Sequence, residues 1–200
     1  MAGTPSIGLL DWAIAIVLTA FVIAPLATLA HELGHAAVAL LLGRGRVSVF
    51  VGQPGYSVTG RIGRLQVTFS PFPANGVSHA GLCVCEQPPT GRRARIALLL
   101  AGPLMTAACM VALTWAALTS LDAPGWQLAT LVCGAIDCLC QLLVNLDPRS
   151  EPHERPGEMR RDGPRAVALA RATAPAPARP GEDVPGPREG TSVAPPQRPR

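Results

Sequence analysis

Apolar residues gather in three long stretches of the chain, residues 9–42, 96–121 and 126–146, with few charged residues inside them. A helix needs about 20 mainly apolar residues to cross the roughly 30 Å hydrocarbon core of a membrane. Each stretch reaches that length, so the pattern predicts three transmembrane helices. The first stretch is longer than one crossing requires. We expect it to bend at Pro25, because proline removes a backbone donor from a helix.

The loop between the first two stretches, residues 43–87, has a different period. Val47, Val49 and Val51 alternate with other residues, and a second alternation covers residues 62–69. Successive side chains of a strand point to opposite faces of a sheet, so a period of two is typical of a half-buried strand. We therefore expect a small β-hairpin or curved sheet here.

The end of the chain has neither period. Residues 173–200 are rich in Pro, Arg and Ala and contain almost no large apolar side chain. Such a segment cannot bury enough surface to offset the entropy lost on ordering, so we expect a disordered tail. The pattern as a whole predicts a mostly α integral membrane protein, with a membrane-embedded core over residues 1–172 followed by this tail.

The charges favour one orientation in the membrane. All 17 basic residues are arginines, against 13 acidic residues; seven arginines lie in residues 43–95, ten lie after residue 148, and none lies in the connector 122–125. Positive loops stay in the cytoplasm. This predicts a multi-pass protein of the cell membrane with the N-terminus outside and the long loop and C-terminus in the cytoplasm. Only 4% of residues are aromatic, which disfavours a nucleic-acid partner.

The string His31-Glu32-Leu33-Gly34-His35 lies inside the first stretch. Residues four apart share one helix face, so both imidazoles can bind one metal ion with Glu32 beside them. Neutral imidazoles suit Zn²⁺, which takes a third protein ligand and a water. Zinc lowers the pKa of that water, and Glu32 is the candidate general base. The alternative interpretation is a polar patch that lines a helix interface.

A third zinc ligand has to come from a distant part of the chain. Its chemistry restricts it to Asp, Glu or His. The candidates on the expected side of the membrane are Asp137, Asp147, His153 and Asp162, with His79 in the loop.

Further motifs accompany the histidine string. They are Ala101-Gly102-Pro103, Asn145-Leu146-x-Pro148 and Asp162-Gly163. Together with His-Glu-x-x-His in a membrane span, they resemble the site-2 protease family of intramembrane zinc peptidases over roughly residues 9–172. The resemblance implies zinc ligands at His31, His35 and Asp162, a general base at Glu32, and a contact of Asn145 with the substrate backbone.

The resemblance also implies how a substrate is held. In that family a transmembrane substrate segment is unwound and cut as an extended strand, often beside an edge strand of the loop; residues 47–51 and 62–69 are the candidates here. The expected function is therefore an intramembrane zinc metalloendopeptidase whose partners are the lipid bilayer and a membrane-protein substrate. The alternative is a catalytically inactive, peptidase-derived membrane scaffold or binding protein, because the polar segment 149–161 separates Pro148 from Asp162.

Overall fold

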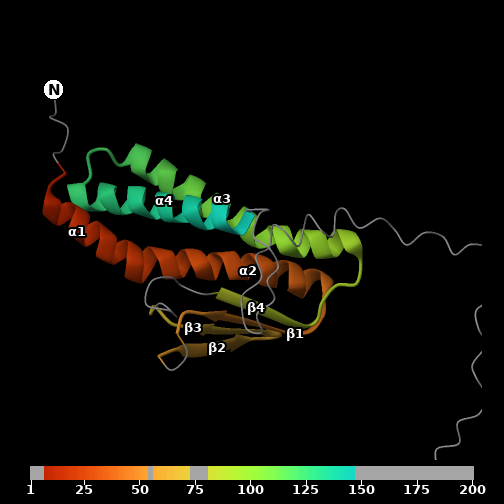
Figure 1. Cartoon of the computed structure of the whole chain (residues 1–200). Helices are drawn as coiled ribbons and strands as arrows, with labels where there is room; N and C mark the ends of the chain where they lie inside the picture. Colours follow the sequence, from red (N-terminus) through yellow and green to blue (C-terminus); the bar gives the residue numbers. More distant parts are fainter. Residues whose placement is uncertain (1–6, 54–55, 73–80, 147–200) are drawn as a thin grey trace, which may run out of the picture.

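The computed structural model describes residues 7–53, 56–72 and 81–146, which fold into long helices and a small sheet (Figure 1). The helical elements are α1 (Leu9–Leu18), the π-helix η1 (Thr19–Ile23), α2 (Ala24–Leu42), α3 (Arg92–Thr119) and α4 (Gly125–Leu146). The strands are β1 (Arg44–Val51), β2 (Val58–Ile62), β3 (Leu65–Phe69) and β4 (Gly81–Gln87). The mostly helical fold with a small sheet in the long loop is confirmed. The predicted tail, residues 173–200, lies outside the described residues.

Within the described residues, three helical stretches are long and apolar enough to cross a membrane: Leu9–Leu42, Arg92–Thr119 and Gly125–Leu146. Their boundaries match the predicted spans to within a few residues. Large apolar side chains point outward along them, including Leu10, 73% exposed, and Ile16, 62% exposed. A bundle surrounded by water rarely exposes so much contiguous apolar surface, so this exposure is typical of helices that face lipid.

The first of these stretches bends without breaking. The π-turn Thr19–Ile23 widens the helix just before Pro25, which lies in the first turn of α2. Proline offers no N–H to the preceding turn, and a π-turn is one of the usual places where a helix changes direction. The stretch changes direction where α1 meets α2 (Figure 1), as expected from the position of Pro25.

The four strands form one mixed sheet in the order β2-β3-β1-β4. β1 pairs with β3 in parallel and with β4 in antiparallel register, so β1 lies inside the sheet. The candidate edge at residues 47–51 was therefore wrong. Residues 62–69 are also not one edge strand, because a turn at Gly63 (φ +58°) separates β2 from β3. The edges of the described sheet are β2 and β4.

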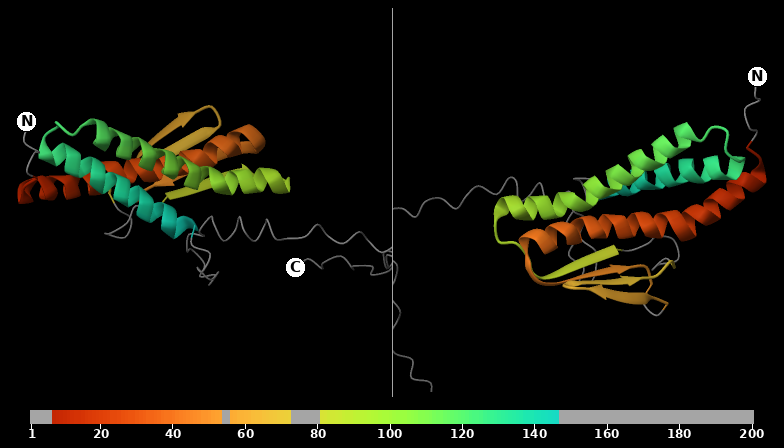
Figure 2. Two further views of the ribbon diagram at one scale, coloured as in Figure 1. Left: turned by 90° about the horizontal axis from the view of Figure 1, so that it is seen from above. Right: turned by 180° about the vertical axis from the view of Figure 1, so that it is seen from behind.

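The sheet packs against one side of α2, and α3 packs against the other (Figure 2). Val47, Val49 and Val51 point from β1 toward Ala36 and Ala39 of α2, and these five residues form the buried apolar cluster. Small alanines let the helix lie close to the sheet, and the inward valines follow from the period of two. As a result, α2 is the one helix of the described bundle in contact with both the sheet and α3.

Arg64 fastens the hairpin between β2 and β3 to the end of α2. Its guanidinium donates hydrogen bonds to the backbone oxygens of Leu40, Gly43 and Gly45. The last carbonyls of a helix have no partner within the helix, and a cation there also stabilises the helix dipole. Arg64 thus caps the C-terminus of α2 and holds the β2–β3 hairpin beside the start of β1.

We expect Arg64→Ala to lower the free energy of unfolding by about 1 kcal/mol, because several carbonyls at the α2 terminus lose a charged donor. Thermal unfolding of the detergent-solubilised protein measures the effect. Arg61→Ala is the matched control, since the Arg61 side chain donates to the Gly63 carbonyl of its own turn. Equal stability of the two variants would contradict the assigned role of Arg64.

Candidate metal centre

His31 and His35 lie one turn apart on α2 and both point toward α3. Their Nε2 atoms are 3.2 Å apart, and the rings meet edge to face with centroids 4.9 Å apart. Both side chains are buried, with 5% and 7% of their surface exposed. The expected convergence of the two imidazoles is therefore present in the fold.

The two imidazoles fit here because α2 and α3 approach closely at glycines. A Cβ on Gly34 would lie 2.5 Å from the backbone oxygen of Ala101. A Cβ on Gly102 would lie 2.6 Å from Nε2 of His31 and closer still to Nε2 of His35. The backbone oxygen of Ala101 cannot move aside as a flexible side chain can, so the crossing requires glycine at position 34, and Gly102 leaves the space in front of the two ring nitrogens empty.

The other ring nitrogens are held from α3. Nδ1 of His31 lies 2.8 Å from Oγ1 of Thr106, and Nδ1 of His35 lies 2.6 Å from the backbone oxygen of Leu98. Pro103, buried in the same part of α3, cannot donate to the carbonyl of Leu99, which loosens this turn of the helix. Both rings are thus oriented by α3 and face each other through Nε2.

The separation and surroundings of the two histidine side chains fit two of the ligands of a zinc ion. Zinc binds histidine nitrogen at about 2.0–2.1 Å with tetrahedral angles, which places two such nitrogens about 3.3 Å apart. The observed separation of 3.2 Å is close to that value. Histidines that bind metals usually donate their second N–H to a neighbouring oxygen, and both Nδ1 atoms here have an oxygen within hydrogen-bond distance.

Glu32 is buried, with 8% of its surface exposed. Its side chain contacts a different element from the one that His31 and His35 face. A Cβ on Gly81 would lie 2.6 Å from Cγ of Glu32 and closer to its Oε1. The carboxyl group therefore sits against the first residue of β4, while the two histidines face α3. The carboxyl group of Glu32 and the imidazole pair therefore face different elements, and the sheet reaches the site at Glu32.

The third ligand is not found among the described residues. Within residues 7–53, 56–72 and 81–146 no group of three or more His, Cys, Asp and Glu side chains is placed to hold a metal ion. Asp137 accordingly does not complete the pair; it accepts a 2.8 Å hydrogen bond from Gln141 on α4. The remaining candidates, Asp162, Asp147, His153 and His79, lie outside the described residues.

Asn145, the expected substrate contact, lies half-buried in the last turn of α4. It is 11 residues after Gly134, and 11 residues are close to three full turns, so the two share a helix face. Gly134 packs against Ile23 and Leu113. Asn145 therefore lies on the face of α4 turned toward the other helices, although α4 touches α2 only sparsely.

The sequence pattern did not predict two residues of the site, Thr106 and Gly81. Thr106 is a polar residue inside an apolar span, four residues after Gly102, and this spacing could have drawn attention to it. Gly81 gave no signal, because its role depends on how β4 pairs with β1.

No protein-family model, no curated protein and no solved structure matches this chain. The resemblance to the site-2 protease family is carried by the motifs quoted above.

We expect Gly102→Ala to abolish binding of Zn²⁺ or Co²⁺, because the added methyl would occupy the space in front of both Nε2 atoms. Isothermal titration of the detergent-solubilised protein measures the affinity. Gly60→Ala is the control, since nothing lies within 4 Å of a Cβ at that position. Metal affinity of Gly102→Ala equal to that of the control would show that the ion binds elsewhere.

Proposed function

We propose that this chain is an intramembrane zinc metalloendopeptidase that hydrolyses peptide bonds in or near transmembrane segments of other membrane proteins. The observation that carries the proposal is the buried pair of Nε2 atoms, 3.2 Å apart, on a helix long and apolar enough to cross a membrane. His31, His35 and Asp162 are the proposed ligands, with Glu32 as the general base and Asn145 as a substrate contact.

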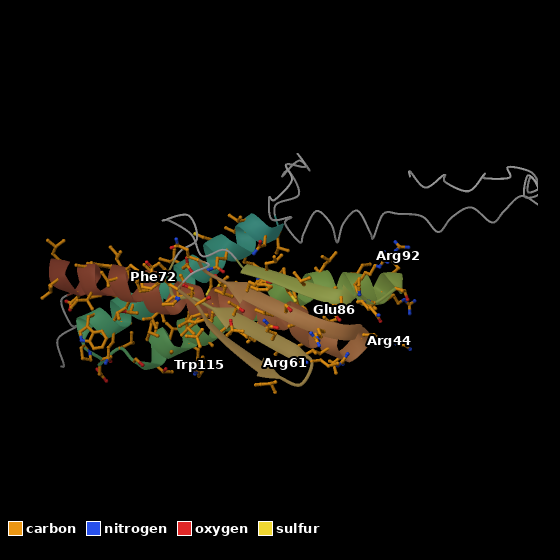
Figure 3. The ribbon with its side chains drawn as sticks, turned by 90° about the horizontal axis from the view of Figure 1, so that it is seen from below. Arg44, Arg61, Phe72, Glu86, Arg92 and Trp115 are labelled. Carbon is orange, nitrogen blue, oxygen red and sulfur yellow. The ribbon has the colours of Figure 1, made fainter. Side chains whose placement is uncertain are left out.

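The distribution of side chains supports a membrane boundary at each end. Trp12 and Trp126 lie next to the contact between Asp11 and Gly125, and tryptophan is enriched at membrane interfaces. Arg44 and Arg92 lie together at the other end of the helices (Figure 3). We place the arginine end in the cytoplasm by the positive-inside rule, with the N-terminus outside.

The lengths of the helices then give the depth of the site. His31 follows Asp11, and Asn145 follows Gly125, by about 20 residues or about 30 Å of helix. Because Asp11 and Gly125 are in contact, His31 and Asn145 are at about the same level. Arg44 follows His31 by 13 residues, or about 20 Å of helix, so we place the site within the membrane toward its cytoplasmic side, a short distance from water.

Hydrolysis requires a proton acceptor for water and a donor for the leaving amine. Zinc, when bound, supplies a Lewis acid for the peptide carbonyl and a water of lowered pKa. Glu32 accepts the proton of the attacking water, the hydroxyl adds to the carbonyl carbon, the C–N bond breaks, and Glu32 delivers the proton to the amine. The two histidines keep their Nδ1 atoms against oxygens of α3 throughout.

The sheet offers a place for an extended substrate. β4 pairs only with β1 in the described sheet, and it begins at Gly81, against Glu32. A peptide added to the open edge of β4 would form backbone hydrogen bonds and run past the general base. This edge replaces the two edges expected from the sequence.

The place where α4 ends supports a ligand from the following segment. α4 ends partway along α2, whereas α3 continues to the far end (Figure 1). The chain therefore leaves α4 at about the level of the histidines. Asp162 follows Leu146 by 16 residues, and a chain of that length reaches up to about 50 Å when extended, so distance does not exclude it.

We expect Glu32→Gln to reduce cleavage by about 10²- to 10⁴-fold while zinc stays bound, because the amide cannot accept the proton. The assay incubates the solubilised protein with a panel of tagged single-span substrates, with and without a chelator. Glu86→Gln is the control; its carboxyl is exposed and accepts the N–H of Arg46. Cleavage by Glu32→Gln at the control rate would remove the peptidase proposal.

The alternative function is a metal-free membrane scaffold derived from such a peptidase. It is favoured by one observation, that the described residues include no third metal ligand. Metal analysis of the purified full chain separates the two: near-stoichiometric zinc that is lost in Asp162→Ala supports the enzyme, and folded protein without zinc supports the scaffold.

A further inference from the structure

Thr106 contributes to the site through the hydrogen on its hydroxyl group. Its side chain is fully buried, and Oγ1 donates to the backbone oxygen of Gly102 at 3.3 Å. A carbonyl oxygen only accepts, so when the single hydroxyl hydrogen is in that bond Oγ1 acts as the acceptor toward its other neighbour. That neighbour is Nδ1 of His31 at 2.8 Å, which in this arrangement carries the hydrogen of the contact; in the opposite arrangement Oγ1 donates to Nδ1.

His35 carries its hydrogen on Nδ1 because of a different partner. Its Nδ1 lies 2.6 Å from the backbone oxygen of Leu98, which cannot donate. Both imidazoles carry hydrogen on Nδ1 when Thr106 donates to Gly102. In neutral rings the lone pairs are then on Nε2, and these two atoms are 3.2 Å apart. Two lone pairs that face each other at that distance favour a cation that both can bind.

We propose that Thr106 is a positioning residue for the metal ion: its hydroxyl, polarised by the Gly102 carbonyl, fixes His31 in the tautomer whose Nε2 binds metal. The Leu98 carbonyl does the same for His35. The identity of the ion as zinc rests on the proposed function; the tautomer of His31 does not. Groups that hold the second nitrogen of a ligating histidine typically change metal affinity by 10- to 100-fold when removed.

The obvious competing role for Thr106 is a local one within α3. Threonines in apolar helices often donate to the carbonyl four residues earlier, and Thr130 does so with Trp126 at 2.7 Å. Thr106 makes this bond and also contacts a histidine on another helix. Thr130, which is buried on α4, is therefore a matched control that loses the local bond alone.

The test compares Thr106→Val, Thr106→Ser and Thr130→Val in the full chain by titration with Zn²⁺ and with Co²⁺, whose visible spectrum reports ligation. Valine keeps the shape of threonine and removes the acceptor. We expect Thr106→Val to bind 10- to 100-fold more weakly, and Thr106→Ser and Thr130→Val to stay within about threefold of wild type. Nitrogen chemical shifts of His31 in the metal-free protein should show Nδ1 protonated in wild type and a tautomer mixture in Thr106→Val.

Two outcomes overturn the proposal. One is metal affinity of Thr106→Val equal to that of Thr130→Val, and the other is a serine variant as weak as the valine variant. If Thr106→Val does not fold, Thr106→Ala read against Thr130→Ala gives the same comparison. Failure of the peptidase is distinguishable: a chain that binds zinc with the expected dependence on Thr106 but cleaves no substrate loses the proposed function and keeps this one. Wild type that binds neither ion overturns both.

Discussion

The crossing of α2 and α3 is the contact on which the site depends. Gly34 lets the backbone of α3 approach α2, and Gly102 leaves room for two imidazoles where a side chain would otherwise stand. Close approach also brings the oxygens of Leu98 and Thr106 within reach of the outer nitrogens of both rings. Any displacement of α3 away from α2 would lengthen these contacts together, because one helix supplies all of them.

The second consequence of this crossing concerns α2 itself. A helix buried on two sides must present different residues to each neighbour: histidines toward α3, alanines toward the valines of β1, and Glu32 toward the start of β4. Buried polar groups are costly without partners. Here the buried polar side chains of α2 face α3, in the case of the histidines, or β4, in the case of Glu32. The sheet therefore does more than cover α2, since its fourth strand forms one wall around the buried carboxyl group.

The sequence predicted the parts of the fold that depend on local pattern. The three apolar helices, the bend near Pro25 and the convergence of His31 with His35 all follow from spacing along one segment. The edge strands could not be predicted, because the turn at Gly63 interrupts an unbroken alternation and because β1 is enclosed by pairing with both β3 and β4. Thr106 and Gly81 were missed for a similar reason: each meets the site through a contact between distant segments, and spacing along the chain does not encode such contacts.

The proposed depth of the site reconciles two opposing requirements. Hydrolysis needs water, whereas the helices that hold the histidines expose apolar side chains over most of their length. A site halfway through the hydrocarbon would need a long water-filled passage between the spans of the described bundle. At about 30 Å from the Asp11 end, the histidines instead stand where α4 ends and where the sheet lies beside α2. On this placement water reaches the site from the arginine end, and the sheet and α3 keep the imidazoles and Glu32 buried.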